Sequence, residues 1–431
     1  MYPRMSYFPR GVLAGATKDG RKVASTRWSG HATRLTATVA AMLTATACTV
    51  VVDGTAQRPA GGPPPGVVDV TLLDTGNYPT RAAPPLGVAG SRSKGALAEA
   101  VRMTEHVIGP WETDPALERW VMPTSIFKDA ASLRILLPER IAAAADKHNF
   151  VTGFSSSRRT DPPGTSLVNA VLRFADPAAA AAAATEFADL ALQPDIADYL
   201  PPAQPVSVPN HPDARASTYE ITPPGSTTPE TAINAYTSRG PFVLIQSADT
   251  PRGVGPTADL VAKALDRQIP AIDKFKPTPV AELPNLALDE SGLLARTIPE
   301  TGDKVPVESN HVYGSYAALH FQTSPQSSAK LFADTGMDLW SRGKASVYRV
   351  RDEEAAAKMV EQFAAESDAS GGPVAPVPNM PDSHCSQHDD RLGSYVVCFA
   401  VADRYVVEAG SAQLNDAHQM AAAQYTMLMA S

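Results

Sequence analysis

The sequence lacks the short motifs that identify the commonest hydrolases and nucleotide-binding proteins. The nucleophile motif Gly-x-Ser-x-Gly does not occur, and neither does the phosphate-binding motif Gly-x-x-x-x-Gly-Lys-Ser/Thr or the dinucleotide motif Gly-x-Gly-x-x-Gly. Cysteine is also scarce, with three among 431 residues. The sequence therefore indicates neither a reaction nor a ligand, and its information concerns location and architecture.

Long hydrophobic runs are scarce as well. The apolar stretch from Leu35 to Cys48, LTATVAAMLTATAC, follows Arg27 and Arg34. It is shorter than the ~20 residues that a membrane-spanning helix needs. A basic region, a short apolar run and small residues are typical of a secretory signal, so we predict that residues 1–47 are removed on export. An amphipathic N-terminal helix of a cytosolic protein and a signal cleaved without lipid attachment are the alternatives.

Cys48 follows Ala45-Thr46-Ala47, which is similar to the lipobox of bacterial lipoproteins, although a large aliphatic residue is more usual than Ala45. This similarity implies that palmitate or a related acyl group on Cys48 anchors the protein to the outer face of the cell membrane. Residues 48–85 are rich in Pro and Gly and are predicted to be a tether. Loss of seven Lys/Arg and one Asp with residues 1–47 takes the net charge from −8 to about −14, which disfavours nucleic acid as a partner.

Cys385 and Cys398 are the cysteines that remain after residue 48. In an exported protein such a pair favours a disulfide. His384 and His388 stand beside Cys385 among several aspartates, which makes them weak candidates for metal ligands. A zinc site needs about four ligands, and export favours the disulfide, so we predict neither a metal nor another cofactor.

The clearest structural signal is an internal repeat. NAVLRFAD at residues 169–176 matches ASVYRVRD at residues 345–352, and both alternate apolar and polar residues as a strand does. Each block ends on an aspartate that we expect to cap a helix. Arg173 and Arg349 occupy the same position in the two blocks. They are weak candidates for anion binding, and the alternative is that each pairs with a local carboxylate.

The pattern of each half is helix–strand–strand–helix–strand–strand–helix. Strands in adjacent pairs predict mainly antiparallel sheets with helices on one face, which is the α+β class. We therefore expect an N-terminal domain at residues 86–275, a Pro-rich linker at 276–310 and a related C-terminal domain at 311–431.

A lipobox, a Pro-rich tether, the segment Asp-Thr-Gly-Asn-Tyr-Pro-Thr at residues 74–80 and two related halves resemble the uncharacterised cell-envelope lipoproteins of mycobacteria and nocardiae. The family has no established activity to transfer. Our leading hypothesis is a non-enzymatic lipoprotein that binds an envelope ligand or protein partner in a groove between the halves. The alternatives are a hydrolase that acts on envelope lipid or polysaccharide, and a sensor or accessory subunit of an envelope system.

Overall fold

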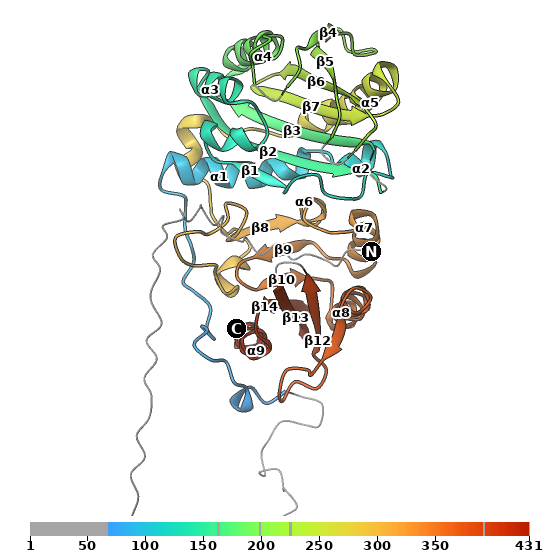
Figure 1. Ribbon diagram of the computed structural model, residues 1–431. Helices are drawn as coiled ribbons and strands as arrows, with labels where there is room; N and C mark the ends of the chain where they lie inside the picture. The colour runs from blue at the N-terminus through green and yellow to red at the C-terminus, as the bar shows by residue number, and fades with distance from the viewer. Residues whose placement is uncertain (1–67, 162–163, 198–199, 224–225, 391–392, 431) are drawn as a thin grey trace, which may run out of the picture. The chain divides into compact units, whose positions relative to one another are not determined.

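The computed structural model describes residues 68–161, 164–197, 200–223, 226–390 and 393–430 (Figure 1). The predicted signal at 1–47, the predicted lipidation site Cys48 and the tether as far as residue 67 lie outside these ranges. Within them, no helix is both long and apolar enough to cross a membrane.

The described chain forms two seven-stranded sheets, and every strand pair in them is antiparallel. The order of the first sheet is β1-β2-β3-β7-β6-β5-β4, and the second repeats it as β8-β9-β10-β14-β13-β12-β11 (Figure 1). This confirms the α+β class and the duplication. The strands of the first sheet are β1 (Ser125–Phe127), β2 (Phe150–Arg159), β3 (Ser166–Phe174), β4 (Gln204–Val206), β5 (Arg215–Ile221), β6 (Glu230–Arg239) and β7 (Phe242–Thr250). Those of the second are β8 (His311–Gly314), β9 (Leu339–Arg342), β10 (Ser346–Arg349), β11 (Gly372–Val374), β12 (His384–Asp390), β13 (Gly393–Ala402) and β14 (Tyr405–Ser411).

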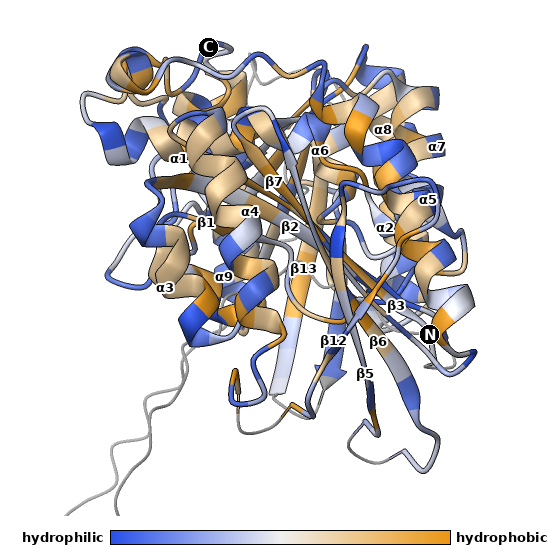
Figure 2. Cartoon of the chain, turned by 90° about the horizontal axis from the view of Figure 1, so that it is seen from above, coloured by the Kyte–Doolittle hydropathy of each residue, from blue (hydrophilic) through white to orange (hydrophobic). Residues whose placement is uncertain are grey.

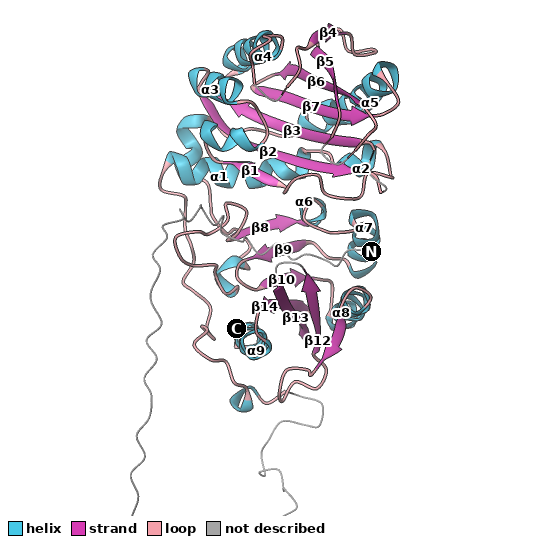
Figure 3. Cartoon of the chain, in the orientation of Figure 1, coloured by secondary structure: helices cyan, strands magenta, loops and turns pink. Residues whose placement is uncertain are grey.

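The helices repeat in the same order between the strands (Figure 3). The predicted caps are confirmed, because the side chains of Asp176 and Asp352 each accept a backbone N–H three residues on, at 2.8 Å in both copies. The matching helices are α3 (Glu139–Lys147) with α7 (Pro325–Thr335), α4 (Pro177–Ala191) with α8 (Glu353–Asp368), and α5 (Val254–Ile272) with α9 (Leu414–Met429). The 3₁₀ turn η3 (Ala130–Ile135) matches the short helix α6 (Ser315–Leu319).

Helices cover both faces of each sheet, so the expectation of helices on one face is wrong. In the first sheet, α3 and α4 pack on the face of Leu172 and Phe174, whereas α1 (Arg92–Met103) and α5 pack on the face of Phe154 and Leu244. In the second sheet, α6, α7 and α8 pack around Phe399, and α9 contacts β13 and β14 from the other side. The reason is that the central strands β7 and β13 bury consecutive side chains, and therefore both faces, over much of their length. Figure 2 colours the residues of the chain by hydropathy.

Part of the segment at residues 276–310 repeats a contact of the first half. In α5, the Gln268 side chain accepts the N–H of residue 108 at 3.0 Å and donates to the carbonyl of residue 106 at 2.9 Å. In α9, Gln424 accepts the N–H of residue 298 at 2.8 Å and donates to the carbonyl of residue 296 at 2.7 Å. The backbone at 296–298 is therefore the structural equivalent of that at 106–108.

The segment at residues 74–80 packs against α9. The Tyr78 hydroxyl donates to Asp416 at 2.9 Å, and the Gln419 amide donates to Asp74 at 2.8 Å. The first residues that the structure describes are thus bound to the last helix of the chain.

Candidate functional site

A small pocket lies where the two halves meet, beside β1 and β8. The backbone N–H of Ile126 in β1 donates to the Glu308 carboxylate at 3.1 Å, which joins the halves at this point. The pocket has a volume of about 200 Å³. Its lining is Trp120, Val121, Met122, Pro123 and Thr124 from the first half, and Glu308, Phe321 and Arg342 from the second.

The first wall is the segment that leads into β1. Ser157 of β2 fixes this segment, because its hydroxyl accepts the Met122 N–H at 3.1 Å and donates to the Met122 carbonyl at 2.9 Å. The Thr124 hydroxyl donates to the His320 carbonyl of the second half at 2.8 Å. The wall is thereby bound at one end to its own sheet and at the other to the opposite half.

The second wall combines an aromatic ring with a cation. Arg342 is buried, and its guanidinium carbon lies 5.1 Å from the ring centre of Phe321 and 5.7 Å from that of Trp340. Such cation–π contacts hold a guanidinium over apolar surface. The lining of the pocket is therefore largely apolar and includes one basic and one acidic side chain, Arg342 and Glu308.

Arg158 of β2 lies behind the first wall. Its side chain is fully buried, and its guanidinium carbon lies 4.4 Å from the Trp120 ring centre and 5.5 Å from that of Trp111. Its Nη2 donates to the carbonyls of His320 and Gln322 at 3.0 and 2.9 Å. Burial lowers the pKa of Arg158 to about 9, so the group stays protonated at neutral pH.

The His320 ring is buried among the aromatic rings of both halves. Its centre lies 5.3 Å from Trp111, 5.0 Å from Phe154 and 5.6 Å from Tyr316. Burial lowers the pKa of His320 to about 3, and nearby Arg158 acts in the same direction. The ring is therefore neutral at physiological pH and works as a flat packing surface at the junction.

Arg173 and Arg349, the predicted anion-binding candidates, lie away from this pocket, and carboxylates hold both. Arg173 is buried and donates to Glu99 of α1. Arg349 donates through Nε and Nη2 to the two oxygens of Asp338, at 2.8 and 2.7 Å. Each guanidinium thus has an anion from the protein itself.

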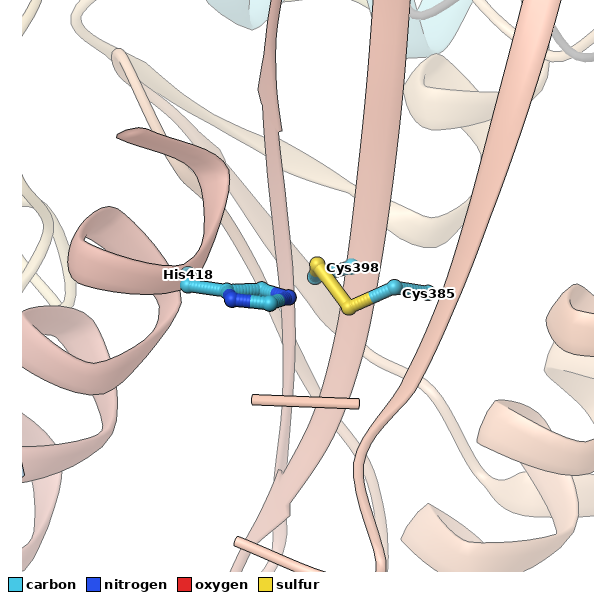
Figure 4. Close-up of side chains that lie close together, drawn as sticks. All are labelled: Cys385, Cys398 and His418. Atoms are coloured by element: carbon cyan, nitrogen blue, oxygen red, sulfur yellow. A yellow bond between two sulfur atoms is a disulfide. The ribbon is translucent and has the colours of Figure 1, made fainter. Parts of the chain in front are cut away.

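The structure brings Cys385 and Cys398 together in a disulfide with an S–S distance of 2.05 Å. The two residues are directly opposite each other in β12 and β13, and His418 of α9 approaches them (Figure 4). A nitrogen of His418 and the two sulfur atoms lie within 4.8 Å of one another, as metal ligands would. Because the sulfurs are joined, neither offers the thiolate that a metal needs.

His384 and His388, the weak metal candidates, both pair with the end of α8. His384 Nε2 lies 3.0 Å from an oxygen of Asp368, and His388 Nε2 lies 2.8 Å from the hydroxyl of Ser367. The His388 ring also stacks on Tyr395, with the ring centres 4.8 Å apart. Both histidines therefore fasten β12 and β13 to α8.

Sequence reasoning expected a groove between the halves but did not identify the residues that line this pocket, and it missed Arg158. The one available signal was the run Trp120-Val121-Met122-Pro123, which is apolar but precedes a strand of only three residues, Ser125–Phe127. Nothing in the sequence pairs that run with Glu308 or Arg342, because the contact depends on how the two halves dock.

Comparison with protein families gives two matches. Residues 86–288 match the model described as "Domain of unknown function (DUF7373) N-terminal", and residues 293–431 match "Domain of unknown function (DUF7373) C-terminal". No curated protein matches. Among solved structures, the extracellular domain of PknH from Mycobacterium tuberculosis is similar at 12% identity and a TM-score of 0.25, over 39% of this chain and 95% of that one.

Proposed function

The chain belongs to the DUF7373 family, whose two parts match both halves of the structure, and we propose that it is a lipid-anchored, non-enzymatic binding protein of the cell envelope. The ligand occupies the pocket between residues 120–124 and the second half. The observation that carries this proposal is the pocket itself, which has an apolar lining from both halves and few polar groups, as small-molecule sites usually do.

The polar side chains of the pocket favour binding over catalysis. Thr124 donates to the His320 carbonyl, Glu308 accepts the Ile126 N–H, and Arg342 lies over aromatic rings. A catalytic acid, base or nucleophile must reach the substrate with its reactive atom. Here Thr124 and Glu308 are engaged in contacts between the two halves, and Arg342 packs against aromatic rings of its own half.

The anchor is the part of the proposal that depends on sequence alone. Acylation of Cys48 would retain the protein at the membrane surface, and the Pro/Gly-rich segment that follows would separate the folded part from the lipid. In the native host, we expect the Cys48→Ala variant to move from the membrane fraction to the soluble one and to lose label from radioactive palmitate. An unlabelled wild type, or a variant that fractionates like it, would contradict the anchor.

Mass spectrometry of the intact native protein tests the pocket. We expect a small molecule to accompany wild type purified gently from membranes, and the Met122→Trp variant to lose it because indole fills the cavity. Ile135→Trp is the matched control, since Ile135 is exposed and does not line the pocket. Equal retention in both variants, or no accompanying mass in wild type, would argue against this site.

A further inference from the structure

Arg158 is a buried cation that the protein itself does not neutralise. Its Nη2 has two carbonyl partners, but Nε and Nη1 have no hydrogen-bond partner among the described residues. Glu118, the acid that acts on it, does so by charge alone and is exposed. Burying a charged group without an ionic partner is energetically unfavourable.

Arg173 shows how the same chain treats another buried arginine. Both side chains are almost completely inaccessible, at 0% for Arg158 and 3% for Arg173. Arg173 lies against the buried carboxylate of Glu99, whereas Arg158 lies against two tryptophan rings and two carbonyls. Of these two arginines, Arg173 has a carboxylate against it and Arg158 does not.

The guanidinium of Arg158 lies directly behind the wall of the pocket. Trp120 lines the pocket and also stacks on the guanidinium at 4.4 Å. Thr124, another lining residue, donates to the same His320 carbonyl that accepts from Arg158. Trp120 is only half-buried, so its ring is not enclosed on all sides by the core.

We propose that the pocket takes an amphiphile with a carboxylate head, and that this carboxylate accepts hydrogen bonds from Nε and Nη1 of Arg158 once the Trp120 ring has turned aside. The inference rests on the proposed function, because the apolar body of the ligand lies in the same pocket. A carboxylate would supply the charge and the acceptors that Arg158 lacks, and charge-assisted bonds to arginine are among the strongest hydrogen bonds in proteins. The lining itself carries one positive and one negative side chain, Arg342 and Glu308, so the net charge that favours a carboxylate comes from Arg158 behind the wall.

Two probes of matched length test the proposal, namely octanoate and octan-1-ol, titrated into the folded full chain by calorimetry. We expect wild type to bind octanoate at least tenfold more tightly than octan-1-ol. Arg158→Met should remove that preference and leave octan-1-ol binding unchanged. Arg119→Met is the control, because Arg119 is a neighbouring cation that donates to Asp161, and it should keep the preference.

Equal binding of the two probes to wild type would overturn the carboxylate proposal and leave the pocket as an apolar binding site. Binding of neither probe would also overturn the carboxylate proposal. The proposed function is tested separately, by mass spectrometry of the native protein and any small molecule that accompanies it. An octanoate preference that survives in Arg158→Met would also refute the role of Arg158. If that variant does not fold, the two wild-type titrations decide, together with Arg158→Lys, which keeps the charge but loses the paired donors and should weaken octanoate selectively.

Discussion

The first half of the protein, which has no disulfide at the equivalent positions, serves as an internal reference for removal of the Cys385–Cys398 disulfide. The two cysteines are opposite each other in β12 and β13. By the matching strand orders, the same positions in the first half are Ala216 and Ala235, which are opposite each other in β5 and β6. The double variant Cys385→Ala/Cys398→Ala therefore gives the second sheet a pair that the first sheet already accommodates.

The magnitude follows from the length of the closed loop. The cysteines are separated by 13 positions, and loop closure of this size restricts the unfolded chain by about 3 kcal/mol. For a domain of this size, such a loss lowers the melting temperature by roughly 10 °C. Conversely, Ala216→Cys/Ala235→Cys should stabilise the first half by up to about 3 kcal/mol, because its loop is of similar length.

Urea unfolding of wild type and the double alanine variant measures the change in free energy of unfolding. Wild type refolded with a reductant separates the effect of the cross-link from that of the two buried sulfur atoms. Hydrogen exchange then locates the effect, and we expect faster exchange in β12–β14 with no change in β5–β7. A double variant within about 0.5 kcal/mol of wild type, or an effect spread equally over both sheets, would refute this reasoning.

Three further predictions concern other buried contacts. Gln268→Leu and Gln424→Leu each remove the partner of one backbone N–H and one carbonyl, and Gln268→Leu also removes an acceptor of the Asn169 amide. Urea unfolding should therefore show a loss of about 2–4 kcal/mol for each variant, and no loss in either would contradict their equivalence. Gly95→Ala should destabilise the protein by about 1–3 kcal/mol because the new Cβ would lie 2.0 Å from the Leu283 carbonyl oxygen. Gly255→Ala should stabilise its helix because no atom lies within 4 Å of the new Cβ. Thermal melts should show a lower melting temperature for the first variant and a higher one for the second, and shifts in the same direction would contradict this reasoning. The folded-state pKa of His320, about 3, lies below its unfolded value, so the unfolded state binds the extra proton and stability falls as pH decreases below about 6.5. Relative to His320→Leu, wild type should lose about 1.4 kcal/mol more per pH unit between pH 6 and 5 in urea titrations, and equal slopes would exclude His320 as the cause.

The sequence predicts the duplicated scaffold because local patterns encode it. An aspartate directly before a helical run commonly caps the helix, as Asp176 and Asp352 do. The strands before them show an alternation of apolar and polar residues that is visible without tertiary information. The coverage of both sheet faces was mispredicted because Ala-rich helices such as α4 present little amphipathic contrast, and short apolar strands read the same whether one or both faces are buried.

The contacts that define the candidate site are not encoded locally. Glu308 meets Ile126 only after the two halves have docked, and Arg342 meets Phe321 only after the second half has folded. Likewise, the equivalence of Gln268 and Gln424 is hidden because glutamine in a helix is ordinarily a surface residue. Its role becomes visible only when the partner backbone segment is in place.

The site lies where the two copies differ. In the shared strand order, β2 corresponds to β9, and the register of each with its neighbour aligns Ser155 with Arg342. Strand β2 continues to Arg159, whereas β9 ends at Arg342, so Arg158 belongs to an extension that the second copy lacks. Duplication thus explains the scaffold, and divergence at one strand end explains how an unpaired cation came to lie beside the junction. If the cation served only the fold, a carboxylate partner such as the one that Arg173 has would be the simpler arrangement, which is why we assign Arg158 to a ligand.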